Sequence, residues 1–426
     1  LEGVWNIQDQ GELTDILTTH PYPFWVEHCQ RTPLNHFRTL MHATAQTQYY
    51  ASVGKKPCLV EELGSMGPMV CEEKTAADFL RVNLWSNWAN GSPGVLWWCA
   101  FDQTQLTAPP YDWNMCEREL GMVDGDRRPK PSLLCMKEFK KQLDSLQLDL
   151  PEKQTDGVCI LSRGQDHWGI AYMSYLLAKQ AGLTLDFAYC EQELPEVGMY
   201  FLPSVCMEVM SKKSYDRLKK KVYDGAVLYI SMKDGFLTEF EEFTGLQVKT
   251  ADKSSVQGSM NWNGIDFNYR KPYHIRLAAA RAEVLAANAD GEPVFSAASY
   301  GAGRVYFLNF PLEDMLLTDV SGLETPYYRF YEKAAEAVLE KRGIRKTNPY
   351  VGMTLHQGTD SAYAVLVNYS AKEQDAGIIC HGYEKTMECL FGNVEKIEPF
   401  GAAIIRYCGR VDAPCKGRIC STEEVN

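Results

Sequence analysis

The spacing of apolar and polar positions changes along this chain and divides it into three zones. In the first zone, short apolar runs alternate with segments whose apolar residues recur about every 3.6 positions. The pattern predicts three strands and two helices: strands within residues 14–25, 56–64 and 94–101, and helices over residues 34–52 and 75–91. Thr75 and Gly91 are typical of the two ends of the second helix. Strands that alternate with helices in this way indicate parallel βα units.

A second alternating zone follows a polar linker at residues 148–157. Its pattern predicts four strands and two helices: strands at residues 157–164, 183–190, 198–205 and 226–231, and helices at residues 167–182 and 211–225. Residues 293–310 predict a hairpin around Gly301 and Gly303, and residues 327–343 predict a closing helix. We therefore expect a doubly wound, flavodoxin-like parallel sheet over residues 155–345.

In the third zone the apolar period shortens to two. Short strands are predicted at residues 361–370, 375–382 and 402–408, with turn residues between them. This spacing favours a small antiparallel β-sandwich over residues 346–410. The last stretch, residues 411–426, has few apolar residues and is expected to be loosely ordered.

Composition narrows the class of protein. The 426 residues are 45% hydrophobic and 23% charged, which is typical of a globular protein with two or three domains. The net charge of -12 would repel a phosphate backbone, so we expect no nucleic-acid partner. No apolar run reaches the ~18 residues that a membrane-spanning helix needs, so we expect no membrane partner either.

The 14 cysteines show neither CxxC pairs nor zinc-ligand spacing. Several lie in apolar runs, such as Cys58, Cys99 and Cys159, which favours reduced core thiols and a cytoplasmic or anaerobic setting. We expect no metal and no cofactor. The first residues lack an initiator methionine and read like the interior of a longer protein. Secretion therefore stays open, because the true N-terminus is expected to lie upstream.

Polar and aromatic side chains follow the strands of the first zone, and the carboxyl ends of parallel strands gather at one edge. They are His20, Tyr22, Glu61, Glu62, Trp97, Trp98, Asp102 and Gln103. Taken singly, each has a structural explanation, such as a solvated strand edge, a hydrogen-bonded histidine or a core tryptophan. Together they would form a polar pocket with an aromatic wall, which suits a sugar. A carboxylate in such a pocket can attack an anomeric carbon.

Three segments of this zone, in order, resemble a known family. They are "THPYPFW" (19–25), "KPCLVEELG" (56–64) and "GSPGVLWWCAFDQ" (91–103). They look like the segments after the sixth and seventh strands, and the eighth strand, of a clan A glycoside hydrolase (β/α)8 barrel. That group contains β-mannanases, cellulases and β-galactosidases of the family 5 and family 42 type. The resemblance implies that residues 1–145 form the last three βα units of such a barrel.

The resemblance also implies a role for one of the two adjacent acids. In the family pattern the nucleophile is the Glu two positions before the Gly, which is Glu62. Tyr22 would donate a hydrogen bond to it and keep it ionised. Side chains alternate along a strand, so Glu61 is expected to face the other side and pair with a neighbouring cation.

For the sugar itself, the resemblance implies that His20 lines the site, that Trp98 is the stacking platform and that Trp97 is its packing partner. The implied activity is that of a retaining β-glycosidase acting on β-glucosides, β-mannosides or β-galactosides. Leu63 stands where the family often has an aromatic residue. The family's acid/base glutamate follows the fourth strand in an Asn-Glu dipeptide, and this sequence contains no Asn-Glu. We therefore expect the proton donor upstream or on another chain, and no activity from this chain alone.

The second zone resembles the class I glutamine amidotransferase-like domain that follows the barrel in some β-galactosidases and supports their assembly. This implies a possible homo-oligomer. Amidotransferase chemistry itself is disfavoured, because Cys206 in "FLPSVCMEV" lacks a flanking glycine and no partner histidine motif follows. The remaining alternative to a glycosidase is a non-catalytic carbohydrate-binding or assembly protein built on a barrel remnant.

Overall fold

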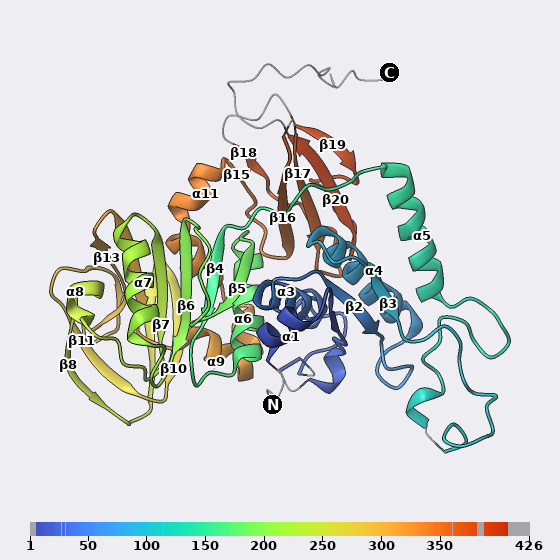
Figure 1. Cartoon of the computed structure of the whole chain (residues 1–426), viewed down its shortest axis with the longest axis horizontal. Coiled ribbons are helices and arrows are strands. Elements are labelled where there is room, and N and C mark those ends of the chain that lie inside the picture. Colours follow the sequence, from blue (N-terminus) through green and yellow to red (C-terminus); the bar gives the residue numbers. More distant parts are fainter. Residues whose placement is uncertain are drawn as a thin grey trace. The chain divides into compact units, whose positions relative to one another are not determined.

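The computed structural model describes residues 6–407 except 27, 30, 114, 360 and 381–386 (Figure 1). The chain divides into two compact units. Unit 1 comprises Leu1–Gln154 and Leu339–Asn426, and unit 2 comprises Thr155–Val338. The tail expected to be loosely ordered, residues 411–426, lies outside the described residues.

The first part of unit 1 alternates strands with helices, as the apolar spacing predicts. Its elements are α1 (Ile7–Leu13), β1 (Leu17–Thr19), η1 (Pro23–Trp25), α2 (Phe37–Leu40), α3 (His42–Gly54), β2 (Cys58–Leu63), α4 (Glu73–Ala89), β3 (Val95–Trp97), η2 (Met115–Glu117) and α5 (Pro131–Leu146). The three strands form one parallel sheet in the order β1-β2-β3. The helix predicted over residues 34–52 is two helices, α2 and α3.

Residues on β3 alternate between the two faces of this sheet. Val95 and Trp97 pack into an apolar cluster with side chains of α4 and α5. Leu96 and Trp98 are 54% and 40% exposed. The face opposite the helices is therefore open to solvent in this chain.

The second part of unit 1 is antiparallel. Its strands are β15 (Ile344–Arg345), β16 (Val351–Gln357), β17 (Ala362–Asn368), β18 (Ile379–Cys380), β19 (Glu388–Phe391) and β20 (Ala402–Tyr407). They form a four-stranded sheet, β16-β17-β20-β19, and a two-stranded sheet, β15-β18. Part of the strand predicted at residues 375–382 lies outside the described residues.

One hydrogen bond and one ring contact join this antiparallel part to α4 of unit 1. The Tyr369 hydroxyl lies 2.5 Å from Ser86 Oγ on α4. The rings of Phe391 and Trp85 are 4.9 Å apart. The polar linker expected at residues 148–157 is partly paired as well, since the Gln154 amide donates to the Leu355 carbonyl at 2.8 Å.

Unit 2 is built on a seven-stranded sheet with the order β12-β13-β14-β7-β6-β4-β5. Its elements are β4 (Gly157–Leu161), α6 (His167–Gln180), β5 (Leu185–Tyr189), β6 (Met199–Val205), α7 (Lys212–Tyr223), β7 (Val227–Met232), α8 (Phe240–Thr244), β8 (Leu246–Asp252), β9 (Val256–Trp262), β10 (Ile265–Lys271), β11 (His274–Ala279), β12 (Glu283–Ala287), β13 (Pro293–Tyr300), β14 (Gly303–Leu308), α9 (Leu312–Thr318), η3 (Ser321–Leu323) and α10 (Tyr328–Ala334). Strands β5, β4, β6, β7 and β14 are parallel, and β13 and β12 continue the sheet antiparallel.

Helices cover both faces of this sheet, which accounts for the continuous apolar runs of β4 and β6. On one face, Tyr200 and Leu202 of β6 share a core with Leu218 of α7. On the other face, the Phe201 ring lies 4.7 Å from the ring of Tyr331 in α10. The side chains of Asp166 and Ser211 cap the first turns of α6 and α7.

Two features of unit 2 differ from the sequence-based expectation. The closing helix predicted over residues 327–343 is interrupted at Ala335, giving α10 and α11 (Glu336–Arg342). The apolar pattern assigns no element between residues 232 and 292, yet this region holds two antiparallel ribbons, β8 with β11 and β9 with β10. Burial in β10 alternates strictly, with polar side chains outward, so a period-two signal was present there.

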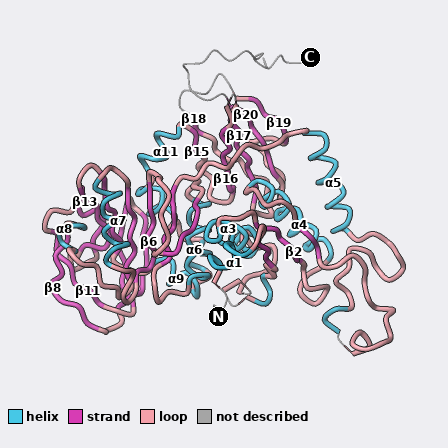
Figure 2. The backbone as a smooth tube through the Cα atoms, viewed as in Figure 1, coloured by secondary structure: helices cyan, strands magenta, loops and turns pink. Residues whose placement is uncertain are grey.

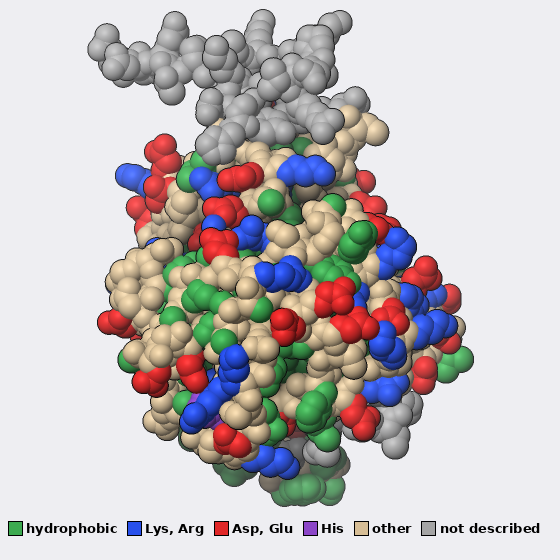
Figure 3. All heavy atoms as spheres, turned by 90° about the vertical axis from the view of Figure 1, so that its left-hand side faces the viewer, with side chains coloured by type: hydrophobic (Ala, Val, Ile, Leu, Met, Phe, Trp, Pro, Cys, Tyr) green, Lys and Arg blue, Asp and Glu red, His purple; other side chains and the backbone are tan. Residues whose placement is uncertain are grey.

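The surface carries mixed charge. Figure 3 shows acidic and basic side chains interspersed over one face of the molecule. Within the described residues, no helix combines the length and the apolar character that crossing a bilayer requires.

Candidate active site

The candidate site lies where the three strands of the unit 1 sheet end. Because β1, β2 and β3 are parallel and paired in order, the residues that follow them meet at one edge. His20 and Tyr22 follow β1, Glu61 and Glu62 close β2, and Trp98 follows β3. The structure therefore brings five of the residues that the sequence singles out to this edge, namely His20, Tyr22, Glu61, Glu62 and Trp98.

Glu62 is held by two hydrogen-bonding groups, one on each carboxylate oxygen. His20 Nδ1 lies 2.7 Å from Oε2, and the Tyr22 hydroxyl donates to Oε1 at 3.0 Å. The Glu62 side chain is 24% exposed, so one side of the carboxylate stays accessible. Burial, and then the Glu62 charge, raise the pKa of Tyr22 far above its ordinary value. Tyr22 therefore stays protonated and keeps donating.

Glu61 lies against the same histidine, and this corrects the expectation that it faces away from the site. His20 Nε2 is 3.3 Å from Glu61 Oε2, so the imidazole stands between the two acids. Hydrogen bonds from Thr18 and then His20 lower the pKa of Glu61. The cause is a register shift between Val60 and Leu63, where β2 pairs with β3. Such an irregularity breaks strict alternation, so both acids turn toward His20.

The two tryptophans lie in different surroundings. Trp97 packs into the α4 and α5 cluster, with its ring 6.5 Å from the ring of Phe79. Trp98 is 40% exposed and donates from Nε1 to Glu117 Oε2 at 3.0 Å. Gly64 allows this edge to close up, because a Cβ there would lie 2.8 Å from the Trp98 carbonyl and 3.1 Å from the Tyr22 ring.

Glu117 is a site residue that the sequence does not reveal. It lies in η2, within the long connection between β3 and α5, and no motif surrounds it. Its charge contributes, after burial and Glu62, to the raised pKa of Tyr22. Glu117 therefore adds a carboxylate beside Trp98 and fixes the orientation of the indole. Only the folded connection, largely loop in Figure 2, brings it there.

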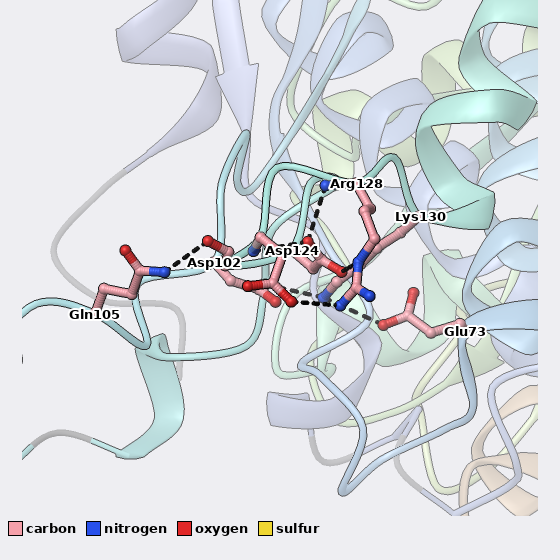
Figure 4. A network of polar contacts seen from close by, with 8 residues as sticks. Glu73, Asp102, Gln105, Asp124, Arg128 and Lys130 are labelled. Carbon is pink, nitrogen blue, oxygen red and sulfur yellow. Dashed lines mark hydrogen bonds and ion pairs between the residues drawn. The ribbon is translucent and has the colours of Figure 1, made fainter.

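A network of ion pairs anchors this connection (Figure 4). Lys130 Nζ lies 2.9 Å from Asp102 Oδ1 and 3.2 Å from Glu73 Oε1 on α4. Asp102 also accepts the Gly121 amide at 2.9 Å. The Asp102 and Lys130 side chains are only 8% and 12% exposed. Asp102, which the sequence placed among the pocket residues, therefore serves to hold the loop.

Two arginines organise the rest of the connection. Arg128 binds the carboxylates of Asp124 and Asp126, each at 2.7 Å. The Arg118 guanidinium donates to the carbonyls of Thr104, Leu106 and Tyr111. Since Arg118 directly follows Glu117, the carboxylate next to Trp98 sits on a braced part of the loop.

Unit 2 offers no comparable chemistry at Cys206. That thiol is buried, and burial raises its pKa to about 11. A thiol in this state is protonated at neutral pH and is a poor nucleophile. Over the described part of the chain, no group of three His, Cys, Asp or Glu residues is placed to hold a metal ion.

Comparison with known proteins finds solved structures that share the fold of this chain. No protein-family model matches the sequence, and no curated protein matches it. Among solved structures, a catalytic mutant of Gan42B, a GH42 β-galactosidase from G. stearothermophilus, aligns with a TM-score of 0.69 at 14% identity, over 94% of this chain and 61% of that one. The β-galactosidase from Bacillus circulans sp. alkalophilus aligns with a TM-score of 0.67 at 15% identity, over 95% and 62%.

A third structure is the exo-β-1,4-mannosidase Op5Man5 from Opitutaceae bacterium strain TAV5, with a TM-score of 0.61 at 19% identity, over 76% of this chain and 60% of that one. The chain thus spans about three-fifths of the length of the proteins it resembles. At these identities the likeness establishes the fold. The chain shares an α/β, TIM-barrel-type fold with clan A glycoside hydrolases, and the resemblance noted from its sequence is confirmed at that level.

Proposed function

We propose that the protein is a retaining β-glycosidase with Glu62 as its nucleophile. One observation carries the proposal: the Glu62 carboxylate lies between His20 Nδ1 and the Tyr22 hydroxyl at the carboxyl end of β2. The two contacts hold the carboxylate in one orientation, and a carboxylate placed in this way can attack an anomeric carbon. The exposed Trp98 ring beside them supplies a face on which a sugar can stack.

The reaction runs in two steps. A Glu62 oxygen forms a bond to the anomeric carbon while the bond to the leaving-group oxygen breaks, and that oxygen takes a proton from the acid/base residue. Water then gives a proton to the same residue and attacks the anomeric carbon, which releases Glu62 and the sugar with its configuration retained. Tyr22 and His20 orient the carboxylate in both steps. Glu117 holds the Trp98 indole in place through its hydrogen bond.

We propose that the acid/base residue lies outside this chain, on the missing part of a (β/α)8 barrel. The three-stranded parallel sheet has two free edges among the described residues, and its β3 edge exposes Leu96. In folded proteins, unpaired strand edges and exposed apolar patches are usually covered by further strands or helices, or by a partner chain. The first of the solved structures of the same fold is longer than this chain, which spans 61% of it.

The substrate class we propose is a β-galactoside, β-mannoside or β-glucoside, free or within an oligosaccharide. Two of the similar structures are β-galactosidases and one is an exo-β-1,4-mannosidase, which supports the first two sugars. The amidotransferase-like resemblance of unit 2 supports a homo-oligomer. The molar mass of the protein in solution, measured by light scattering, would test whether it forms such an oligomer.

The test compares two neighbouring glutamates in the intact enzyme. Glu62→Gln keeps the shape of the side chain and removes the attacking charge, so kcat should fall by roughly 10³-fold or more. Glu61→Gln is the matched control. It should cost far less, although more than a solvated acid would, because Glu61 shares His20 with Glu62. Near-normal turnover by Glu62→Gln, or equal losses at both positions, would reject the assignment.

Rescue by azide distinguishes a nucleophile from an acid/base residue. With Glu62→Gly, azide should attack from the face where the carboxylate stood and give a glycosyl azide of inverted configuration. A rescued acid/base variant would give the retained configuration instead. Nuclear magnetic resonance of the product reads the difference directly.

The second candidate is a non-catalytic carbohydrate-binding or assembly protein. The open face of the unit 1 sheet favours it, because this chain by itself presents no second carboxylate that we assign as proton donor. General acid catalysis is worth roughly 10²- to 10⁴-fold, so the 426-residue chain alone should not turn over aryl β-glycosides at an enzymatic rate. If a protein that includes the upstream sequence also binds sugar without cleaving it, this second function replaces the first.

A further inference from the structure

Unit 2 contains a polar hollow that the proposed glycosidase site does not explain. It measures about 630 Å³, which falls within the size range of small-ligand sites. It lies between the β9–β10 ribbon and the end of α9, two elements seen near each other in Figure 1. Its lining side chains include Gln257, Ser259, Asn268, Arg270, Thr318 and Asp319.

Cross-strand pairing places four of these side chains together. Asn268 stands opposite Ser259, and Arg270 stands opposite Gln257. All four are exposed, on the outer face of the ribbon, while the intervening residues are turned inward. Pairs two residues apart on a strand lie roughly 7 Å from each other, so the four side chains cover a patch of sugar-like dimensions.

The walls of the hollow are fixed by bonds within the protein. Arg270 donates to the Thr318 hydroxyl, and Asp319 accepts the Ser321 hydroxyl at 2.8 Å and the Gly322 amide at 3.1 Å. The β10 backbone is held by the Tyr327 hydroxyl, which donates to the Asn268 carbonyl. Such bracing lowers the entropy that a ligand must remove on binding.

Three side chains in the hollow keep their hydrogen-bonding capacity. Within the part of the chain that the structure describes, the side chains of Gln257, Ser259 and Asn268 bond to no other residue. The opposite holds further along the same face, where Asn261 donates to Asp266 at 2.7 Å.

We propose that this hollow binds a neutral, hydroxyl-rich ligand, namely an oligosaccharide, at a site separate from Glu62. Amide and hydroxyl side chains both donate and accept, as sugar hydroxyls do. One arginine and one aspartate balance in charge, so the lining does not favour an anion, and a single carboxylate is too few for a metal ion. Tyr269 and Met315 add apolar surface to the lining, which the C–H faces of a sugar can contact.

The test titrates the 426-residue chain with lactose, mannobiose, cellobiose and their longer oligomers. Binding is followed by calorimetry and by amide shifts in β9 and β10. The double variant Gln257→Ala with Asn268→Ala should weaken this binding at least about tenfold, since each lost amide removes hydrogen bonds to the ligand. Asn261→Ala is the matched control, because Asn261 is the same residue type on the same face but lies outside the hollow. This variant should bind the sugar with the affinity of the wild type.

Glu62→Gln separates the two sites. It should leave the β9 and β10 shifts intact, so this proposal stands even if Glu62 proves non-catalytic. The proposal is overturned if no sugar shifts these amides, if the double variant binds as tightly as wild type, or if Glu62→Gln abolishes the shifts. It is also overturned if phosphate or sulfate binds there in place of sugar and Arg270→Ala removes that binding.

Discussion

The parallel strands of the two units differ at their carboxyl ends. In unit 1 the carboxyl ends of β1, β2 and β3 present exposed polar side chains, with His20 52% and Glu61 48% exposed. In unit 2 the corresponding ends of β4 and β6 are closed by the chain itself. Parallel α/β topology favours a ligand site at both places, because the strand order reverses beside β4. At the second place the exposed charged side chains are paired with each other, since Arg163 lies 3.0 Å from Glu191.

The closure in unit 2 is made by one glutamine and one methionine. Gln165 Nε2 donates to the carbonyls of Pro203 and Ser204, and its Oε1 accepts the Ser162 amide at 2.9 Å. Met207 packs over Gly164, where a Cβ would lie 3.0 Å from the Met207 sulfur. The backbone groups that would hold a ligand are thus already occupied by the protein.

The acidic residues of the two sheets differ in the same sense. Glu62 has two protein donors and an accessible side. Glu313 in α9 is fully buried and accepts from the hydroxyls of Ser204, Ser231, Tyr229 and Tyr331. A carboxylate that keeps an open side can act on a ligand, whereas one that is completely surrounded can only stabilise the fold. The predictions below test this distinction.

The largest effect is expected at Glu313. Glu313→Ala would leave four buried hydroxyls without their acceptor and open a cavity, at a cost of roughly 3–5 kcal/mol in the free energy of unfolding of unit 2. Glu313→Gln keeps the volume and one acceptor and should cost about half as much. Hydrogen exchange of the β6 and β7 amides measures both. Glu62→Gln, the control in unit 1, should leave these amides unchanged, and a loss under about 1 kcal/mol in Glu313→Ala would contradict the structural role.

A smaller effect is expected from Lys271, another ionisable group inside unit 2. It is 4% exposed, and burial lowers its pKa from the ordinary 10.5 to about 8, while the charge of Glu292 acts weakly in the other direction. Between these two pH values the unfolded chain binds a proton that the folded chain does not. Stability therefore rises with pH across this window, by about 3 kcal/mol in total, and is flat below pH 8.

The measurement compares wild type with Lys271→Met, because buried cysteines and tyrosines titrate in the same window and cancel in the difference. Wild type should gain about 3 kcal/mol relative to the variant between pH 7.5 and 10.5. A constant difference across this window would mean that Lys271 is solvated in the folded state. That would weaken the view that unit 2 uses its ionisable groups for stability alone.

Sequence patterns predict the elements of this protein better than the details of its site. Apolar spacing indicates the βα units, and strand order then brings His20, Tyr22 and Glu62 to one edge. The contact of Glu61 with His20 depends on the register shift between Val60 and Leu63, which arises from pairing with β3 and leaves no mark in β2 itself. Glu117 contacts Trp98 because Arg118 and the Asp102–Lys130 ion pair hold the long connection between β3 and α5 in place. No local sequence motif therefore predicts this contact.

The smallest effect is expected at Tyr22. This prediction tests whether Glu62 depends on the hydrogen bond that Tyr22 donates. Tyr22→Phe removes the hydroxyl that donates to Glu62 Oε1 at 3.0 Å and keeps the ring. A hydrogen bond to a charged group is worth roughly 1.5–3 kcal/mol, and His20 remains in place, so kcat/KM of the intact enzyme should fall about tenfold.

The pH profile gives this last prediction its sharpest form. Without the hydroxyl, Glu62 loses its donor at Oε1 whatever the pH, so the loss in kcat/KM should persist across the working pH range. The alkaline side should not move, because the pKa of Tyr22 is raised so far by burial and by Glu62 that it does not ionise in the working range. Tyr363→Phe in β17 is the matched control, since its hydroxyl bonds to Ser361 away from the site, and its profile should equal that of wild type. An unchanged kcat/KM in Tyr22→Phe would mean that Glu62 needs no help from Tyr22, and the contrast between an open, donor-supported carboxylate in unit 1 and an enclosed one in unit 2 would then rest on exposure alone.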